Sequence, residues 1–267
     1  MRARRLAARL LVSGACAVAI GCSNDPDQLF YELGRSDGLT PRELRGRDLY
    51  YRHCVGCHGE KGDGQGLASS FLDPRPRDFT RGIYKFRSTP TASLPTDLDL
   101  LRTLREGVHG TSMPSWRLVP DDELMSVIAY VKTFSTRFTK NAPMPAISLP
   151  GAPADIRSPE RIERGRKVYA ELQCGKCHGD SGKGDGPSAT TLTDSEDHPI
   201  RPFDFTKLTP KGGARPEDLY RTFMTGLAGT PMPDYSEMTS DDSQRWDLVA
   251  FVLSLRASAN PANQENR

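Results

Sequence analysis

Apolar residues recur at helical spacing near the end of each half of the chain. Two runs, 122 residues apart, follow the pattern i, i+3, i+4, i+7 that places side chains on one helix face: Leu124, Val127, Ile128 and Val131, then Trp246, Val249, Ala250 and Leu253. No segment resembles a βαβ pattern. The hydrophobic pattern therefore predicts that the two halves end in equivalent helices.

A different apolar run stands at the start of the chain. Residues 10–20 are apolar and follow a basic stretch with Arg2, Arg4, Arg5 and Arg9. The run is too short to span a bilayer and is typical of an export signal. Ala19-Ile20-Gly21-Cys22 resembles the lipobox of bacterial lipoproteins, in which the cysteine is lipidated. We predict a signal peptide over 1–21, lipidation of Cys22 and a tether over 22–41.

The same region suggests a destination. Ser23 follows Cys22, where an Asp would favour retention in the inner membrane in enteric-type sorting. We expect a lipid anchor on the periplasmic side of a membrane, with the outer membrane favoured. An ordinary signal peptide with an incidental cysteine, and hence a soluble periplasmic protein, is the alternative.

Charge argues against one class of partner. The 267 residues include 36 Lys and Arg against 34 Asp and Glu. Removing the four signal arginines leaves 32 basic residues, so the mature chain has a net charge of −2. Since no basic block follows, nucleic acid is not expected as a partner.

The sequence Cys-x-x-Cys-His occurs twice, as Cys54-Val-Gly-Cys57-His58 and Cys174-Gly-Lys-Cys177-His178. Exported cysteines can form disulfides, and cysteine with histidine can bind zinc, although four-coordinate closure needs more ligands than one motif offers. The third possibility is haem c. Two thiols on one helical turn add to the haem vinyl groups, and the following histidine binds iron. Two such motifs favour two covalently bound haems.

The repeat extends beyond the motif. Each half contains a Gly-x-x-x-Tyr before the cysteines, a Gly-Asp-Gly after them, an Arg-Pro segment ending in Asp-Phe-Thr, and a Gly-Thr-x-Met-Pro loop. The methionines of these loops, Met113 and Met232, lie 55 and 54 residues after the respective motif histidines. We predict domains over 42–138 and 160–257, a proline-rich linker over 139–159 and a tail over 258–267.

These shared segments resemble the class I (mitochondrial-type) cytochrome c family in both halves. The resemblance implies that a helix carrying the motif crosses the C-terminal helix at a glycine, Gly46 facing Tyr130 and Gly165 facing Phe251. It also implies that Met113 and Met232 are the sixth ligands of the two irons, opposite His58 and His178. The fold expected is two tandem all-α haem domains.

Supporting residues around each haem can be predicted too. Each ligating histidine needs a carbonyl acceptor for its distal N–H, and the carbonyls of Pro76 and Pro202 are our candidates. Lys85, Arg87 and Trp116 are candidates to bind the first haem's propionates. For the second haem the candidates are Arg201, Lys207 and Tyr235. The difference predicts unequal haem environments.

The expected function follows from the ligand set. Imidazole and thioether together fill the iron's coordination sphere, so we expect outer-sphere electron transfer between a redox protein donor and acceptor, with no catalytic residues. The alternative is a dihaem peroxidase, which needs one vacant or displaceable position. His109 and His198 are the residues that could displace a methionine, and His53 is expected to point away from its haem.

Overall fold

The computed structural model describes residues 38–207, 209–239 and 241–259. The predicted signal peptide and Cys22 lie outside these residues, as do most of the tether and of the tail. The chain divides into Met1–Pro41 and a compact unit, Arg42–Arg267, which contains both halves of the repeat.

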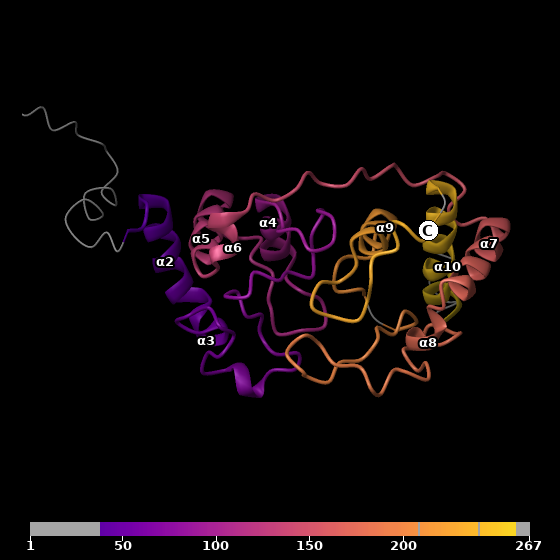
Figure 1. The fold of residues 1–267 in the computed structure, drawn as a ribbon, viewed down its shortest axis with the longest axis horizontal. Helices are drawn as coiled ribbons and strands as arrows, with labels where there is room; N and C mark the ends of the chain where they lie inside the picture. The colour runs from indigo at the N-terminus through magenta and orange to yellow at the C-terminus, as the bar shows by residue number, and fades with distance from the viewer. Residues whose placement is uncertain (1–37, 208, 240, 260–267) are drawn as a thin grey trace, which may run out of the picture. The chain divides into compact units, whose positions relative to one another are not determined.

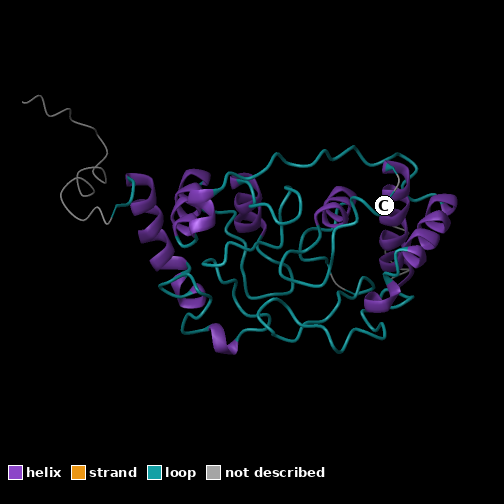
Figure 2. Cartoon of the chain, in the orientation of Figure 1, coloured by secondary structure: helices purple, strands orange, loops and turns teal. Residues whose placement is uncertain are grey.

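Short helices joined by long loops make up both halves (Figures 1 and 2). No strand occurs among the described residues, where the only ladder contact is an isolated bridge between Thr193 and Pro199. The all-α prediction is confirmed. The helices, in chain order, are α2 (Pro41–His53), α3 (Val55–His58), η1 (Ser69–Phe71), α4 (Asp97–Glu106), α5 (Asp121–Thr133), α6 (Thr136–Lys140), α7 (Pro159–Glu171), α8 (Gly175–His178), α9 (Pro216–Thr225) and α10 (Asp242–Ala259).

The helix that leads into each motif crosses the C-terminal helix of its half at a glycine. A Cβ atom on Gly46 of α2 would lie 1.9 Å from the Ser126 carbonyl oxygen and 3.0 Å from Tyr130 Cβ on α5. In the second half a Cβ on Gly165 of α7 would lie 1.8 Å from the Asp247 carbonyl oxygen on α10. Only glycine permits this approach of two backbones. The predicted glycine crossings are present in both halves.

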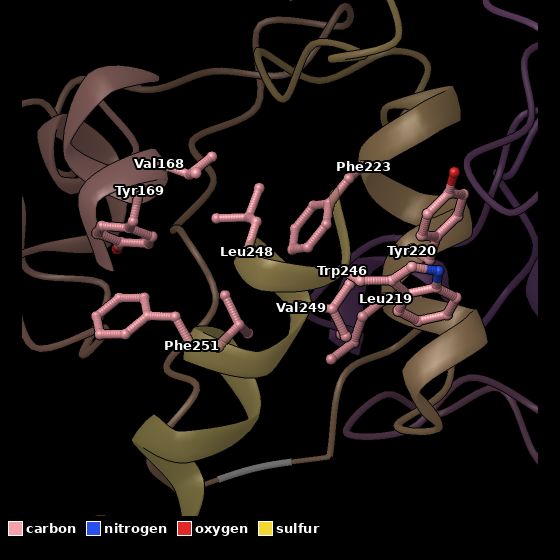
Figure 3. Close-up of a cluster of buried hydrophobic side chains, with 10 residues drawn as sticks. Val168, Tyr169, Leu219, Tyr220, Phe223, Trp246, Leu248, Val249 and Phe251 are labelled. Atoms are coloured by element: carbon pink, nitrogen blue, oxygen red, sulfur yellow. The ribbon is translucent and has the colours of Figure 1, made fainter. Parts of the chain in front are cut away.

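The second half has the larger hydrophobic cluster, which Figure 3 shows. Val168 and Tyr169 from α7 meet side chains of α9 and α10. The predicted face of α10 is buried, with Trp246 4% and Val249 0% exposed. In the first half, Leu100 of α4 and Ile128 of α5 pack around Tyr84. The glycine crossings hold α2 and α7, the helices that lead into the two motifs, against α5 and α10.

Loops of the two halves are hydrogen-bonded to each other inside the compact unit. The Arg87 side chain, 1% exposed, donates from Nη2 to the Thr225 carbonyl at 2.6 Å. Thr91 donates to an Asp234 carboxylate oxygen at 2.6 Å, and Arg81 forms an ion pair with Glu196 at 3.0 Å. The halves are therefore joined by buried and polar contacts as well as by the linker.

The predicted linker has no helix between Asn141 and Ser158. Its backbone is fixed to the first half, because Ile147 N–H donates to the Ser88 carbonyl at 2.8 Å and Met144 N–H to Ser93 Oγ at 3.0 Å. None of the described helices is long and apolar enough to cross a bilayer.

Candidate functional site

Each Cys-x-x-Cys-His motif forms a single helical turn. In α3 the His58 N–H donates to the Cys54 carbonyl at 2.9 Å, and in α8 His178 donates to Cys174 at 2.9 Å. The turn places the two thiols and the imidazole of one motif close together, as covalent haem attachment requires.

A tyrosine and a glycine loop hold each turn in place. Tyr50 OH donates to the Gly59 carbonyl and Tyr169 OH to the Gly179 carbonyl, each at 2.7 Å. The Gly64 N–H then donates to the His58 carbonyl at 2.9 Å. Gly64 has φ +75°, and a Cβ there would lie 2.7 Å from the Pro76 carbonyl oxygen. Both the backbone conformation and the lack of space therefore require glycine at this position.

Each motif histidine has one ring nitrogen paired with a backbone carbonyl. His58 Nδ1 lies 3.1 Å from the Arg77 carbonyl oxygen, and His178 Nδ1 lies 3.2 Å from that of Phe203. The prediction of Pro76 and Pro202 was therefore wrong by one residue, because the chain turns so that those carbonyls face Gly64 and Gly184. An Nδ1–H donor leaves Nε2 as the lone-pair nitrogen available to a metal.

Aromatic rings orient the imidazoles further. The His58 ring stacks on Phe79 at 4.4 Å between centroids, and His178 lies 4.8 Å from Phe205. Burial lowers the pKa of both histidines, against the opposing effect of the backbone hydrogen bond. Both rings are therefore neutral at pH 7, the form that binds iron.

The four motif cysteines are free in this structure, so no disulfide joins the two cysteines of either motif here. Burial raises the pKa of Cys54 to about 12 and that of Cys174 to about 11, so both are protonated thiols at pH 7. Nowhere in the described part of the chain do three His, Cys, Asp or Glu side chains converge as a metal-binding cluster. The arrangement does not suit zinc.

The two methionine loops have the same backbone hydrogen bonds. Val108 N–H donates to the Met113 carbonyl and Leu227 N–H to the Met232 carbonyl, each at 3.1 Å. A threonine hydroxyl two residues before each methionine accepts from its N–H, at 3.1 and 3.2 Å. Both methionines are half-buried. The sequence repeat is therefore also a repeat of local geometry.

In the first half the predicted residues line one cavity of about 230 Å³. Cys54, Cys57, His58 and Met113 all contribute to its wall, with an apolar lining that includes Val127, Ile128, Val131, Leu100 and Leu104. In the second half, Cys174 and Met232 both border the hydrophobic cluster of Figure 3, as does Phe205, the ring beside His178. The cysteines, histidine and methionine predicted to hold each haem therefore all belong to one half of the chain.

The first cavity also contains polar groups without partners. Tyr84 OH and Trp116 Nε1 are buried in the cavity wall and have no hydrogen-bond partner within the described ranges. Buried donors left unpaired are costly. A group with an apolar body and acidic edges, such as haem, matches both the apolar lining and these donors.

Several predicted supporting residues lie elsewhere. Arg87 does not line the cavity, because its guanidinium donates to the carbonyls of Pro90, Tyr84 and Thr225. Lys207 is a surface residue with its side chain 77% exposed, 3.7 Å from Asp204. Lys85 and Trp116 do line the first cavity.

The other predicted residues, two haem-supporting candidates and three histidines, differ in their exposure and in their neighbours. Tyr235 is buried beside the Cys174 thiol, whereas Arg201 is exposed. His109 is exposed, and the His198 ring lies 3.7 Å from Asp194. His53 was expected to point away, but it lines the edge of the first cavity with its ring 5.2 Å from that of Trp116.

One lining residue could not be predicted from the first half. Lys211 belongs to the second half and lines the first cavity. Its place in the chain corresponds to that of Lys85, six residues after the phenylalanine of the Asp-Phe-Thr segment, but no sequence pattern places it at the cavity of the other half.

Comparisons with known proteins agree with this geometry. The profile of the family described as cytochrome c matches residues 162–256, and that of cytochrome c oxidase, cbb3-type, subunit III matches residues 41–131. No curated protein matches the chain. Among solved structures, a chain of the "Kuenenia stuttgartiensis reducing HAO-like protein complex Kustc0457/Kustc0458" is 43% identical with a TM-score of 0.76, and the alignment covers 79% of this chain and 95% of that one.

Proposed function

The chain belongs to the cytochrome c family as a tandem of two domains with two covalently bound c-type haems, and from this premise we propose that it carries electrons through two His/Met-ligated haems. We propose the domain limits 42–138 and 160–257. When bound, the haem iron supplies reversible one-electron transfer.

The proposal rests chiefly on the paired geometry of the two halves. Each half offers two thiols, a neutral imidazole with Nδ1 already hydrogen-bonded, and a thioether on an equivalent loop. We assign Cys54, Cys57, Cys174 and Cys177 to covalent attachment, and His58, Met113, His178 and Met232 to the axial positions. Because the imidazole and the thioether would together leave no open position on the iron, no substrate would reach the metal, so we propose a carrier and not an enzyme.

The stoichiometry of covalent haem tests the assignment. Protein made in a host with haem c maturation should retain two haems per chain after denaturation and acid–acetone extraction, because thioether bonds survive both. Pyridine haemochrome absorbance per mole of protein measures this number. Changing both cysteines of one motif to alanine should leave one haem. Colourless protein from a competent host, or zinc on metal analysis, would contradict the assignment.

For the location we propose a lipid anchor at Cys22 on the periplasmic side of a bacterial membrane, the outer membrane being favoured. The support is the lipobox-like sequence at residues 19–22, since cytochrome c domains are typically extracytoplasmic. Cys22→Ser should move the protein from the membrane to the soluble periplasmic fraction, with unchanged haem spectra. Fractionation of cells that express each form measures this, and membrane retention of the variant would argue for docking on a membrane protein instead.

The donor and acceptor are redox proteins, and for one of them we favour an HAO-like protein. The support is the 43% identity to a chain of the complex named above. The soluble Cys22→Ser protein, purified from its native cells, is the sample for this test. Co-elution with an HAO-like protein is expected, and elution alone under low and high salt would count against this partner.

A further inference from the structure

The first cavity is surrounded by cationic side chains. Arg75, Arg77 and Lys85 come from the first half, and Lys211 comes from the second. Of these, Arg77 has a carboxylate partner, Glu196, at 3.9 Å. Arg75 and the two lysines remain as positive charges beside an apolar cavity.

Lys211 is held at this place by packing between the halves. The turn 210–213 precedes α9, and a Cβ on its Gly212 would lie 3.1 Å from Cδ1 of Phe86, which also lines the cavity. Lys211 is itself exposed, so its ammonium group stands at the rim of the cavity. Its position is therefore set by the docking of α9 and its preceding turn on the segment around Phe86.

Neither lysine has a hydrogen bond or an ion pair among the described residues. Burial, together with like-charge repulsion from Arg77 and Lys211 and against the effect of Asp194 and Glu196, lowers the pKa of Lys85 to about 8. Burial also lowers the pKa of Lys211, against Asp73. No described carboxylate forms an ion pair with either ammonium group, and like charges beside an apolar cavity are unfavourable, which indicates that an anion belongs between them.

We propose that Lys211, together with Lys85, binds the propionate carboxylates of the haem in the first half, so that the second half completes the first haem's site. Two ammonium groups match two carboxylates in charge. The unpaired Trp116 Nε1 and Tyr84 OH in the same wall supply neutral donors. This inference rests on the haem placement proposed above.

By chain position the counterpart of Lys85 in the second half is Lys211 itself, since each lies six residues after the phenylalanine of its Asp-Phe-Thr segment. Lys211 lines the first cavity instead, and Lys207, four residues before it, is exposed and lies beside Asp204. The two haems are therefore expected to differ in the charge around their carboxylates, and only the first depends on contact between the halves.

The test is the pair of reduction potentials of the intact dihaem protein. Lys211→Gln should lower the ferrous-to-ferric ratio of one haem about threefold at a given applied potential. This corresponds to a reduction potential lower by ~28 mV, at ~59 mV per tenfold change for one electron. The reason is that losing a nearby positive charge favours ferric iron. Lys85→Gln should lower the same potential. Lys211→Arg keeps the charge and should leave this potential at its original value. Lys207→Gln, at an exposed residue, is the matched control and should change neither of the two potentials.

The outcomes separate this inference from the proposed ligand set. A Lys211→Gln protein with both potentials unchanged, or with the potential lowered equally by Lys207→Gln, would overturn the role of Lys211. If the proposed iron ligands were wrong, the unmutated protein itself would show a visible spectrum or a haem number other than the expected one. Because the side chain of Lys211 is exposed, the substitution should not affect folding, and the far-ultraviolet circular dichroism checks this.

Discussion

Replacing Met113 or Met232 by alanine should lower the potential of one haem by on the order of 100 mV and leave the other nearly unchanged. The thioether is a neutral, soft ligand that favours ferrous iron, so its loss removes that preference. Each substitution should also remove half of the weak far-red sulfur-to-iron band and open one haem to carbon monoxide. Potentiometric titration and carbon monoxide difference spectra measure these changes.

Met144 provides the matched control. It lies in the linker, outside both repeats, and its side chain is 55% exposed. Met144→Ala should therefore leave potentials, far-red band and carbon monoxide binding as in the unmutated protein.

The same measurements distinguish a carrier from a peroxidase. The unmutated reduced protein should bind no carbon monoxide at neutral pH and should turn over little hydrogen peroxide, since both methionine loops are in place. Carbon monoxide binding at one haem with rapid peroxide reduction would favour the peroxidase. His109 and His198 would then be the residues to test, as replacements for a displaced methionine.

Replacing Gly165 by alanine should destabilise the second half by about 3 kcal/mol or more, at the upper end of overpacking effects. The added Cβ would lie 1.8 Å from the Asp247 carbonyl oxygen, a backbone atom that cannot rotate away. Helix α10 cannot easily retreat either, because the Asp247 carboxylate, 4% exposed as a residue, pairs with Arg161 at 2.6 Å and Arg164 at 2.7 Å. Moving α10 would break these charge-assisted contacts.

The midpoint of urea unfolding, followed by circular dichroism, measures this effect. Gly151→Ala is the control, since a Cβ there meets nothing within 4 Å. Gly46→Ala should have a smaller effect, although its Cβ would lie 1.9 Å from the Ser126 carbonyl oxygen. The flanking ion pair of that crossing, Arg45 with Glu123, is more exposed and so resists movement less. Equal midpoints for Gly165→Ala and Gly151→Ala would show that the crossing tolerates a methyl group.

The sequence alone determined the features that depend on local spacing. Both copies of Cys-x-x-Cys-His form one helical turn, and the i, i+3, i+4, i+7 runs predicted the buried faces of α5 and α10. The glycine crossings at Gly46 and Gly165 were implied by the resemblance to the class I cytochrome c family. Because the chain contains two copies of the domain, features that both halves share could be distinguished from features that occur in one half only.

Features that depend on distant segments were decided by the tertiary structure. The acceptor of His58 is the Arg77 carbonyl and not that of Pro76, because the orientation of a carbonyl is set by the turn that the loop adopts. Arg87 joins the halves through Thr225, 138 positions away, and Lys211 reaches a cavity formed by the other half. No periodicity or motif records such contacts, since they arise only when two folded surfaces meet.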